Sequence, residues 1–285
     1  MAAFSTYYDY WENAIQNWFN GKCMKDWSNP FNNLWNDEKR TKQSSDYIPE
    51  PWWGNHDCNT ELHSVVINFN PGAGGCKQCK SAIPSTNRSS YANDIVGTGT
   101  VVGATYLLGT AKWHYNRRAK PILSALKTIE PSLSFVPTNP DSLKHHLSVE
   151  LIPWHTQNTS SACGFDAYLK NNIKAVYEHS ILFAANESQR ISNGKLKKVV
   201  ILRMSEKNTD WVMKLLTEKV GITCKKTTNK QTINGTHSHY IVYQLCDRSN
   251  LWLKDIKFVS IWGSYTRNNF PGQADLEEIL NQIKS

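Results

Sequence analysis

The chain has 285 residues, a formal net charge of +8 and a pI of about 9.0, with 40% hydrophobic and 20% charged residues. This composition supports a sizeable core and excludes an intrinsically disordered chain, and no stretch approaches the roughly 18 consecutive apolar residues of a membrane span. The modest positive charge suits one basic face for a polyanion, although enzymes without such a partner are often as basic.

The amino terminus and the cysteines indicate the compartment. The stretch MAAFSTYYDYWENAIQNWF has no basic leader followed by an apolar run, so it does not predict a secretory signal. The seven cysteines are scattered and odd in number, which favours reduced thiols over a disulfide framework. We therefore expect a cytoplasmic, monomeric protein without membrane association.

The first segments are aromatic and then extended. Residues 4–20 carry aromatic side chains at helical spacing, which predicts an amphipathic helix whose aromatics are core rather than a base-stacking surface. The stretch YIPEPWWGN (47–55) contains two prolines that enforce an extended path. SVVINFN (64–70) then has the continuous β-branched character of a strand buried on both faces.

Helices and strands alternate through the rest of the chain. Helices are predicted over 104–128, with an interruption at Pro121, and over 164–189, 208–221 and 273–285, and strands over 146–153, 197–204, 238–246 and 256–262. This alternation indicates a three-layer α/β/α fold around a central, mostly parallel sheet. No linker or repeat divides the chain, so we expect one domain over residues 1–285 with a helical, aromatic extension over about residues 1–60.

Three loops that follow predicted strands carry polar residues. They are NPGAGG (70–75), PWHTQ (153–157) and GSYTRNNFPG (263–272). In parallel α/β sheets, ligands bind beyond the carboxyl ends of the strands, so these loops are expected to form the functional site.

The first loop is rich in glycine but is not a nucleotide-binding loop. It matches neither GxGxxG nor GxxxxGK[ST], and it has no lysine where such a loop needs one. Its distinctive residue is Asn70, which Pro71 holds at the strand end, while Gly72 and Gly74 allow a substrate backbone to approach closely. A carboxamide held in this way can orient a water molecule.

The segment NFNPGAGG (68–75) resembles the first motif of the uracil-DNA glycosylase superfamily, in the GxNPG form of its mismatch-specific and single-strand-selective branches. In those branches the Asn before the Pro positions the water that attacks the sugar carbon, and the resemblance assigns this role to Asn70. Asn68 stands where the motif has its first glycine. A segment of the form EP-aromatic-aromatic-G precedes the strand, and the order of elements is similar over roughly residues 47–285.

The last loop resembles the second motif of the superfamily, a small polar turn near the carboxyl terminus that pinches the DNA backbone. It has Trp262, Gly263 and Ser264 where the family usually has His-Pro-Ser, so histidine assistance to the departing base is not implied. The residues expected to bind the DNA backbone are Ser264, Arg267, Asn268, Gly72 and Gly74. An ordinary solvated turn is the alternative for the last loop.

The second predicted strand carries the candidate base-reading residue. In the single-strand-selective branch a strand ending N-x-x-P supplies an Asn that reads the Watson–Crick edge of uracil, and the pattern ELIP puts Glu150 at this position. Cytosine presents an exocyclic amine from which a carboxylate accepts a hydrogen bond, so Glu150 suits cytosine better than uracil. A protonated Glu150 could instead donate to cytosine N3. The alternative is a partly exposed residue at a strand end, because a shift of one residue reverses its face.

Two aromatic residues are candidates for stacking on an extruded base. Phe69 lies beside Asn70, and Trp154 follows the predicted reading strand. For both residues the alternative is an ordinary core side chain.

A rival metal site would use a CxxC pair. Cys76 and Cys79, with Cys58 or His56, could bind zinc or an iron–sulfur cluster. A single pair without a second at matching spacing is weak support, so we expect no metal and no cofactor.

The resemblance to the superfamily implies a DNA N-glycosylase, a hydrolase that flips a base out of the stack and cleaves its N-glycosidic bond to leave an abasic site. It is expected to be monofunctional, because no lysine adjoins Asn70 to form a Schiff base. The expected substrate is a non-standard base, such as a modified cytosine in bacteriophage DNA, and a role in anti-phage defence would follow. The alternatives are a uracil-excising repair enzyme, a catalytically silent nucleic-acid-binding module and a metal-dependent hydrolase.

Overall fold

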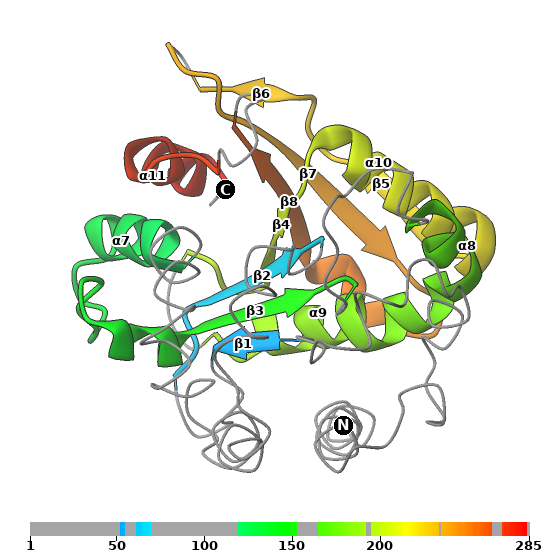
Figure 1. The fold of residues 1–285 in the computed structure, drawn as a ribbon, viewed down its shortest axis with the longest axis horizontal. Coiled ribbons are helices and arrows are strands. Elements are labelled where there is room, and N and C mark those ends of the chain that lie inside the picture. The colour runs from blue at the N-terminus through cyan, green and yellow to red at the C-terminus, as the bar shows by residue number, and fades with distance from the viewer. Residues whose placement is uncertain are drawn as a thin grey trace, which may run out of the picture.

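The structure is a computed structural model that describes residues 52–54, 61–69, 119–152, 165–191, 195–233, 235–263 and 270–283. These residues form a mixed α/β protein in which helices accompany a central sheet of mostly parallel strands (Figure 1). The predicted α/β class is confirmed at this level.

The sheet has the strand order β1-β3-β2-β4-β8-β7-β5, and β6 pairs with β7. The strands are β1 (Trp52–Gly54), β2 (Ser64–Asn68), β3 (His146–Glu150), β4 (Val199–Arg203), β5 (Thr223–Lys226), β6 (Gln231–Thr232), β7 (His239–Cys246) and β8 (Lys257–Trp262). The four central strands β3, β2, β4 and β8 are parallel to one another. Antiparallel pairs flank them, with β1 on one side and β7, β5 and β6 on the other.

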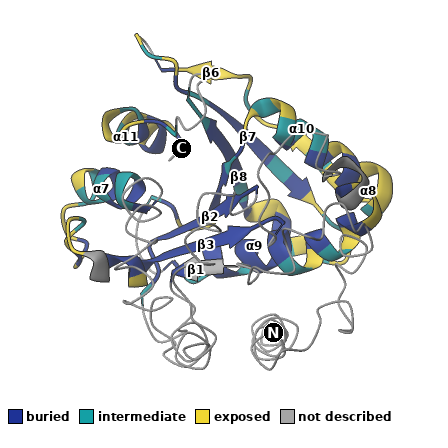
Figure 2. Ribbon diagram, in the orientation of Figure 1, coloured by how far each residue is buried: buried dark blue, intermediate teal, exposed yellow. Residues whose placement is uncertain are grey.

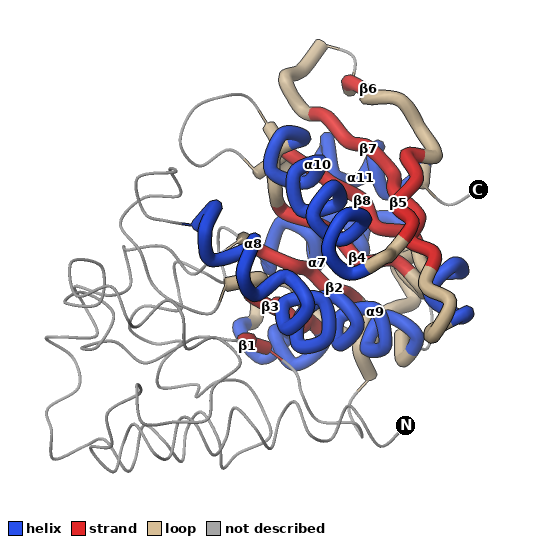
Figure 3. The backbone as a smooth tube through the Cα atoms, turned by 90° about the vertical axis from the view of Figure 1, so that its right-hand side faces the viewer, coloured by secondary structure: helices blue, strands red, loops and turns tan. Residues whose placement is uncertain are grey.

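The helices pack in two groups. The α-helices are α7 (Lys120–Ile129), α8 (Phe165–Val176), α9 (Leu182–Gln189), α10 (Glu206–Leu215) and α11 (Gln273–Gln282); the short helices are η7 (Pro140–His145), η9 (Tyr177–Ile181), η10 (Leu216–Val220) and η11 (Leu251–Asp255). α7 packs against α11, whereas α8 packs against α10, and α9 contacts β2 and β4. Figure 1 shows α7 and α11 to the left of the strands, and in Figure 3 α8 and α10 lie in front of them.

Local sequence explains where three of the helices begin or end. Ser205 caps α10, since its side chain accepts a hydrogen bond from the Asn208 amide, and Gly221 ends η10 in the left-handed conformation with φ 83°. α7 has Pro121 in its first turn, where the missing N–H leaves no intrahelical bond unmade. The residues before 119 lie outside the described residues, so the interruption expected at Pro121 stays a prediction.

Most of the predicted elements are present, with shifts of a few residues at their ends. The strands expected over 64–70, 146–153, 197–204, 238–246 and 256–262, and the helices expected over 164–189, 208–221 and 273–285, all occur. The strands β1, β5 and β6 and the antiparallel direction of β7 were not predicted from the sequence. The helix expected over 4–20, and the expected helical residues before 119, lie outside the described residues.

The core lies at the central strands. All five residues of β2 and all five of β3 are buried, and Figure 2 shows the central strands in the buried colour, with exposed residues on the outer sides of the helices. Among the helices that the structure describes, none has the length and apolar character needed to cross a bilayer.

Candidate functional site

The strand order identifies one edge of the sheet as the favoured place for a ligand. The chain passes from β2 to β3 on one side, then crosses back to β4 and later β8 on the other side of β2. In open α/β sheets ligands bind outside the carboxyl ends of the strands, where the strand order reverses. The reversal here lies between β2, which ends at Asn68, and β4, which ends at Arg203.

Three polar residues stand side by side at this edge. Asn68 is the register partner of Glu150 on β3 and of Arg203 on β4. We call Glu150, Asn68 and Arg203 the terminal row. It places a carboxylate, a carboxamide and a guanidinium at the carboxyl ends of three adjacent parallel strands.

The register also shows which side of the sheet the terminal row faces. Ser260 of β8 makes a 2.9 Å hydrogen bond with Thr209 of α10, and Ser260 is the register partner of Leu202. Leu202 therefore faces α10, and Arg203, the next residue, faces the opposite side. In agreement, the Arg203 guanidinium lies 5.1 Å from the ring centroid of Phe270, which precedes α11.

The carboxamide of Asn68 bridges two residues of β3. Asn68 Nδ2 donates to Ser148 Oγ at 2.5 Å and to Glu150 Oε1 at 3.1 Å, and all three side chains are buried. The opposite amide orientation would turn Oδ1 toward the carboxylate, where neither group has a proton to donate when Glu150 is ionised. With Glu150 ionised, the contact therefore defines the orientation of the amide.

The other end of the same amide is an unsatisfied acceptor. Asn68 Oδ1 is buried and has no hydrogen-bond partner within the described ranges. A buried acceptor without a partner costs about 1–3 kcal/mol, so a water molecule or a ligand donor at this point would be stabilising.

The loops that follow β2 and β3 start from adjacent points. Leu151 N donates to the Asn68 carbonyl at 2.8 Å, and Ile152 N donates to the Phe69 carbonyl at 3.0 Å. The segments that follow β2 and β3 therefore remain hydrogen-bonded to each other for one or two residues beyond the strands. Asn70 and Pro153 are the next residues after this pairing.

A basic and aromatic group lies farther along the same carboxyl edge. His239 of β7 is the register partner of Trp262, the last residue of β8, with 5.5 Å between ring centroids. Lys230 Nζ lies 5.8 Å from the Trp262 ring centroid. Burial and then the charges of Lys230 and His237 lower the pKa of His239, as expected in a positive local field. We call Lys230, His239 and Trp262 the basic edge.

The structure describes only two of the predicted site residues. Glu150 is 1% exposed, so the alternative of a partly exposed strand end is wrong. Phe69 is buried in the hydrophobic core, which agrees with the alternative stated for it. The residues that lie outside the described ranges are Asn70, Trp154, Gly72, Gly74, Ser264, Arg267 and Asn268.

Arg203 and Lys230 are among the residues of these two groups that were not predicted from the sequence. Arg203 is a charged residue that closes a buried strand, and this abrupt change could have identified it. Lys230 lies in a polar segment with no such signal. The suggested metal ligands Cys76, Cys79, Cys58 and His56 lie outside the described ranges, and the described residues contain no group of three or more His, Cys, Asp or Glu able to hold a metal.

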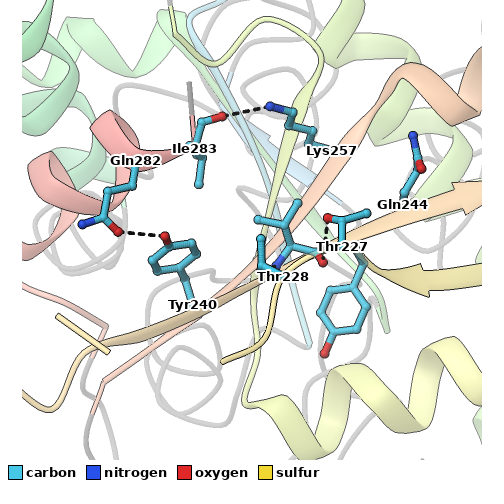
Figure 4. A pocket seen from close by; sticks show the side chains of 9 residues that line it. Thr227, Thr228, Tyr240, Gln244, Lys257, Gln282 and Ile283 are labelled. Atoms are coloured by element: carbon cyan, nitrogen blue, oxygen red, sulfur yellow. Dashed lines mark hydrogen bonds between the residues drawn. The ribbon is translucent and has the colours of Figure 1, made fainter. Parts of the chain in front are cut away.

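A separate groove lies on β7 and β8 beside the end of α11. It encloses about 320 Å³ and is lined by Thr227, Thr228, Tyr240, Val242, Tyr243, Gln244, Lys257, Gln282 and Ile283. Figure 4 shows two of its contacts, the hydrogen bond from Tyr240 to Gln282 at 2.7 Å and that from Lys257 Nζ to the Ile283 carbonyl at 3.1 Å. These polar groups hold α11 against the sheet.

Comparison of the chain with protein-family models, with curated proteins and with solved structures found no match. The resemblance to the uracil-DNA glycosylase superfamily therefore rests on the motif residues of the sequence alone.

Proposed function

We propose that the protein is a monofunctional DNA N-glycosylase that extrudes a non-standard base, a modified cytosine, and hydrolyses its N-glycosidic bond. The observation that carries the proposal is the position of Glu150. It is a buried carboxylate at the carboxyl end of β3, paired in register with the strand that leads into Asn70. The residue expected to read the base thus lies beside the start of the loop expected to activate water.

A three-layer α/β/α arrangement is part of this proposal. The pairing of α7 with α11, and of α8 with α10, supports two helical layers on opposite faces of the sheet. In such a fold the carboxyl edge of the sheet stays open to a ligand while both faces are covered.

The proposed chemistry assigns separate tasks to the residues. Asn70 orients the water that attacks the anomeric carbon, and nearby DNA phosphates stabilise the cation-like sugar. Glu150 accepts a hydrogen bond from the exocyclic amine of the extruded base, against which Trp154 stacks. The backbone is held by Ser264 and Arg267, and no cofactor takes part.

The extruded base must be recognised in a site with little water. Extrusion from a duplex costs a few kcal/mol, which contacts to the base must offset. A buried carboxylate forms stronger hydrogen bonds than an exposed one, and it discriminates more strongly against a carbonyl. The biological setting that we propose is removal of modified cytosines from bacteriophage DNA by a cytoplasmic, monomeric protein.

The test is a base panel. Oligonucleotides that differ only in one base, including cytosine, modified cytosines and uracil, are incubated with the protein and scored for alkali-labile abasic sites. Asn70→Ala is expected to lower cleavage by at least about a hundredfold, because the water loses its orienting group. Asn281→Ala, which removes an exposed carboxamide on α11, is the matched control and should retain activity. Absence of cleavage on every base, with binding retained, would support the nucleic-acid-binding module instead.

A further inference from the structure

Two departures of the chain from the motifs that it resembles contact each other in the structure. Asn68 stands where the first motif has glycine, and Glu150 stands where the base-reading strand has asparagine. They are register partners, and Asn68 Nδ2 donates to Glu150 Oε1 over 3.1 Å. A glycine at position 68 could not make this contact. The two departures therefore form one hydrogen-bonded unit.

We infer that Asn68 is a positioning residue that orients the Glu150 carboxylate toward a base bearing an exocyclic amine. This inference rests on the proposed function. Both N–H groups of Nδ2 are used on β3, one on Ser148 and one on Glu150. Because Ser148 and Glu150 lie two residues apart on one face of the strand, this double contact holds the carboxylate in one orientation.

The unit offers acceptors to a ligand. An ionised carboxylate only accepts hydrogen bonds, and Asn68 donates one to Glu150. Asn68 Oδ1 is a second buried acceptor, with no partner within the described ranges. A cytosine-type base donates from its amine at the position where uracil has a carbonyl oxygen. The unit therefore favours amine-bearing bases and disfavours uracil.

The experiment is a double-mutant cycle in which the measured quantity is the preference of each variant for one base over another. Wild type, Asn68→Ala, Glu150→Gln and the double variant are compared on two oligonucleotides, identical except for uracil or the modified cytosine that the wild type prefers. Base release and binding are both measured. Ser64→Ala is the matched control, because Ser64 is also a buried residue on the same face of β2, hydrogen-bonded to His146 Nδ1 at 2.8 Å.

Asn68→Ala should lower the preference for the amine-bearing base about tenfold, since the carboxylate loses its fixed orientation. The double variant should show no larger loss than Glu150→Gln alone. Ser64→Ala should leave the preference unchanged even if it lowers stability. A purely structural role for Asn68 would slow both bases equally, and this result, or independent effects of the two substitutions, would overturn the inference.

The same measurements separate the inference from the proposed function. A wild type that excises uracil alone overturns the inference and leaves the glycosylase assignment in place. A wild type that binds the amine-bearing base preferentially without releasing any base overturns the assignment, and the binding preferences of the variants then decide the inference. A wild type with neither release nor preference overturns both.

Discussion

Acid should destabilise the fold through buried histidines at the amino ends of β2 and β3, the edge opposite the terminal row. His63 is 2% exposed, and its ring lies 4.8 Å from that of His145 and 5.2 Å from that of Phe135. Burial, and secondarily the charge of His145, lowers the pKa of His63 from 6.5 to about 4, against a smaller opposing effect of Glu61. Burial alone lowers the pKa of His146 to about 3.

The sign and size of the effect follow from proton linkage. Below pH 6.5 His63 becomes protonated in the unfolded chain, whereas in the folded chain it stays neutral until about pH 4. The unfolded state is therefore favoured as the pH falls through this window. Stability is fully present above pH 6.5 and is lost progressively toward pH 4. A difference of one pKa unit is worth about 1.4 kcal/mol. Between pH 6.5 and pH 4, His63 therefore changes the free energy of unfolding by at most about 3 kcal/mol.

The assay is denaturant unfolding at several pH values from about pH 7 to about pH 4, followed by tryptophan fluorescence. His63→Phe keeps an aromatic ring against Phe135. Its free energy of unfolding should fall by up to about 3 kcal/mol less than that of wild type between about pH 7 and about pH 4. His63→Gln is a second variant in case the phenylalanine does not fit, and His237→Gln, at an exposed histidine, is the control. Parallel pH curves for wild type and both His63 variants would refute the reasoning.

Two more substitutions test the sheet and its basic edge. Gly54→Ala should destabilise the protein by at least about 2 kcal/mol in thermal unfolding, because Gly54 has φ 96° and a Cβ atom would lie 2.0 Å from the His146 carbonyl oxygen. Gly272→Ala, where a Cβ meets nothing within 4 Å, should cost under about 1 kcal/mol, and equal losses would contradict this account. Lys230→Ala should weaken DNA binding and reduce the dependence of log K on log salt by about 0.9, whereas Lys214→Ala on α10, whose lysine lies 3.7 Å from Glu218, should not. Equal DNA binding by the two lysine variants would show that the basic edge does not contact DNA.

The central strands were predictable because their own residues are apolar at nearly every position, which indicates burial on both faces. A strand covered on both faces must be apolar at nearly every position, and β2 and β4 have this composition. The end of η10 was equally predictable, since Gly221 supplies the left-handed conformation that closes a helix. β1 and β5 have no comparable signal. β1 has only three residues, and its place depends on pairing with β3, whereas β5 is mostly exposed and charged.

The direction of β7 could have been inferred from the length of its connection. β7 and β8 are joined by residues 247–256, and a parallel crossover needs about a dozen residues or more. The alternation of strands and helices favoured a parallel arrangement, but the only helix in this connection is the short η11. Connection length is therefore the better guide to strand direction at the edge of such a sheet.

The terminal row could not be predicted from any one segment of the sequence. Asn68, Glu150 and Arg203 come from strands far apart in the chain, and only the register of β3, β2 and β4 makes them neighbours. Taken one at a time along the sequence, Asn68 and Glu150 are two separate mismatches to a motif, and each weakens the resemblance. Once they share a hydrogen bond, they amount to one change, because a carboxylate at position 150 gains a donor from the side chain at position 68. Under the proposed function, such a paired change would alter which base the site accepts.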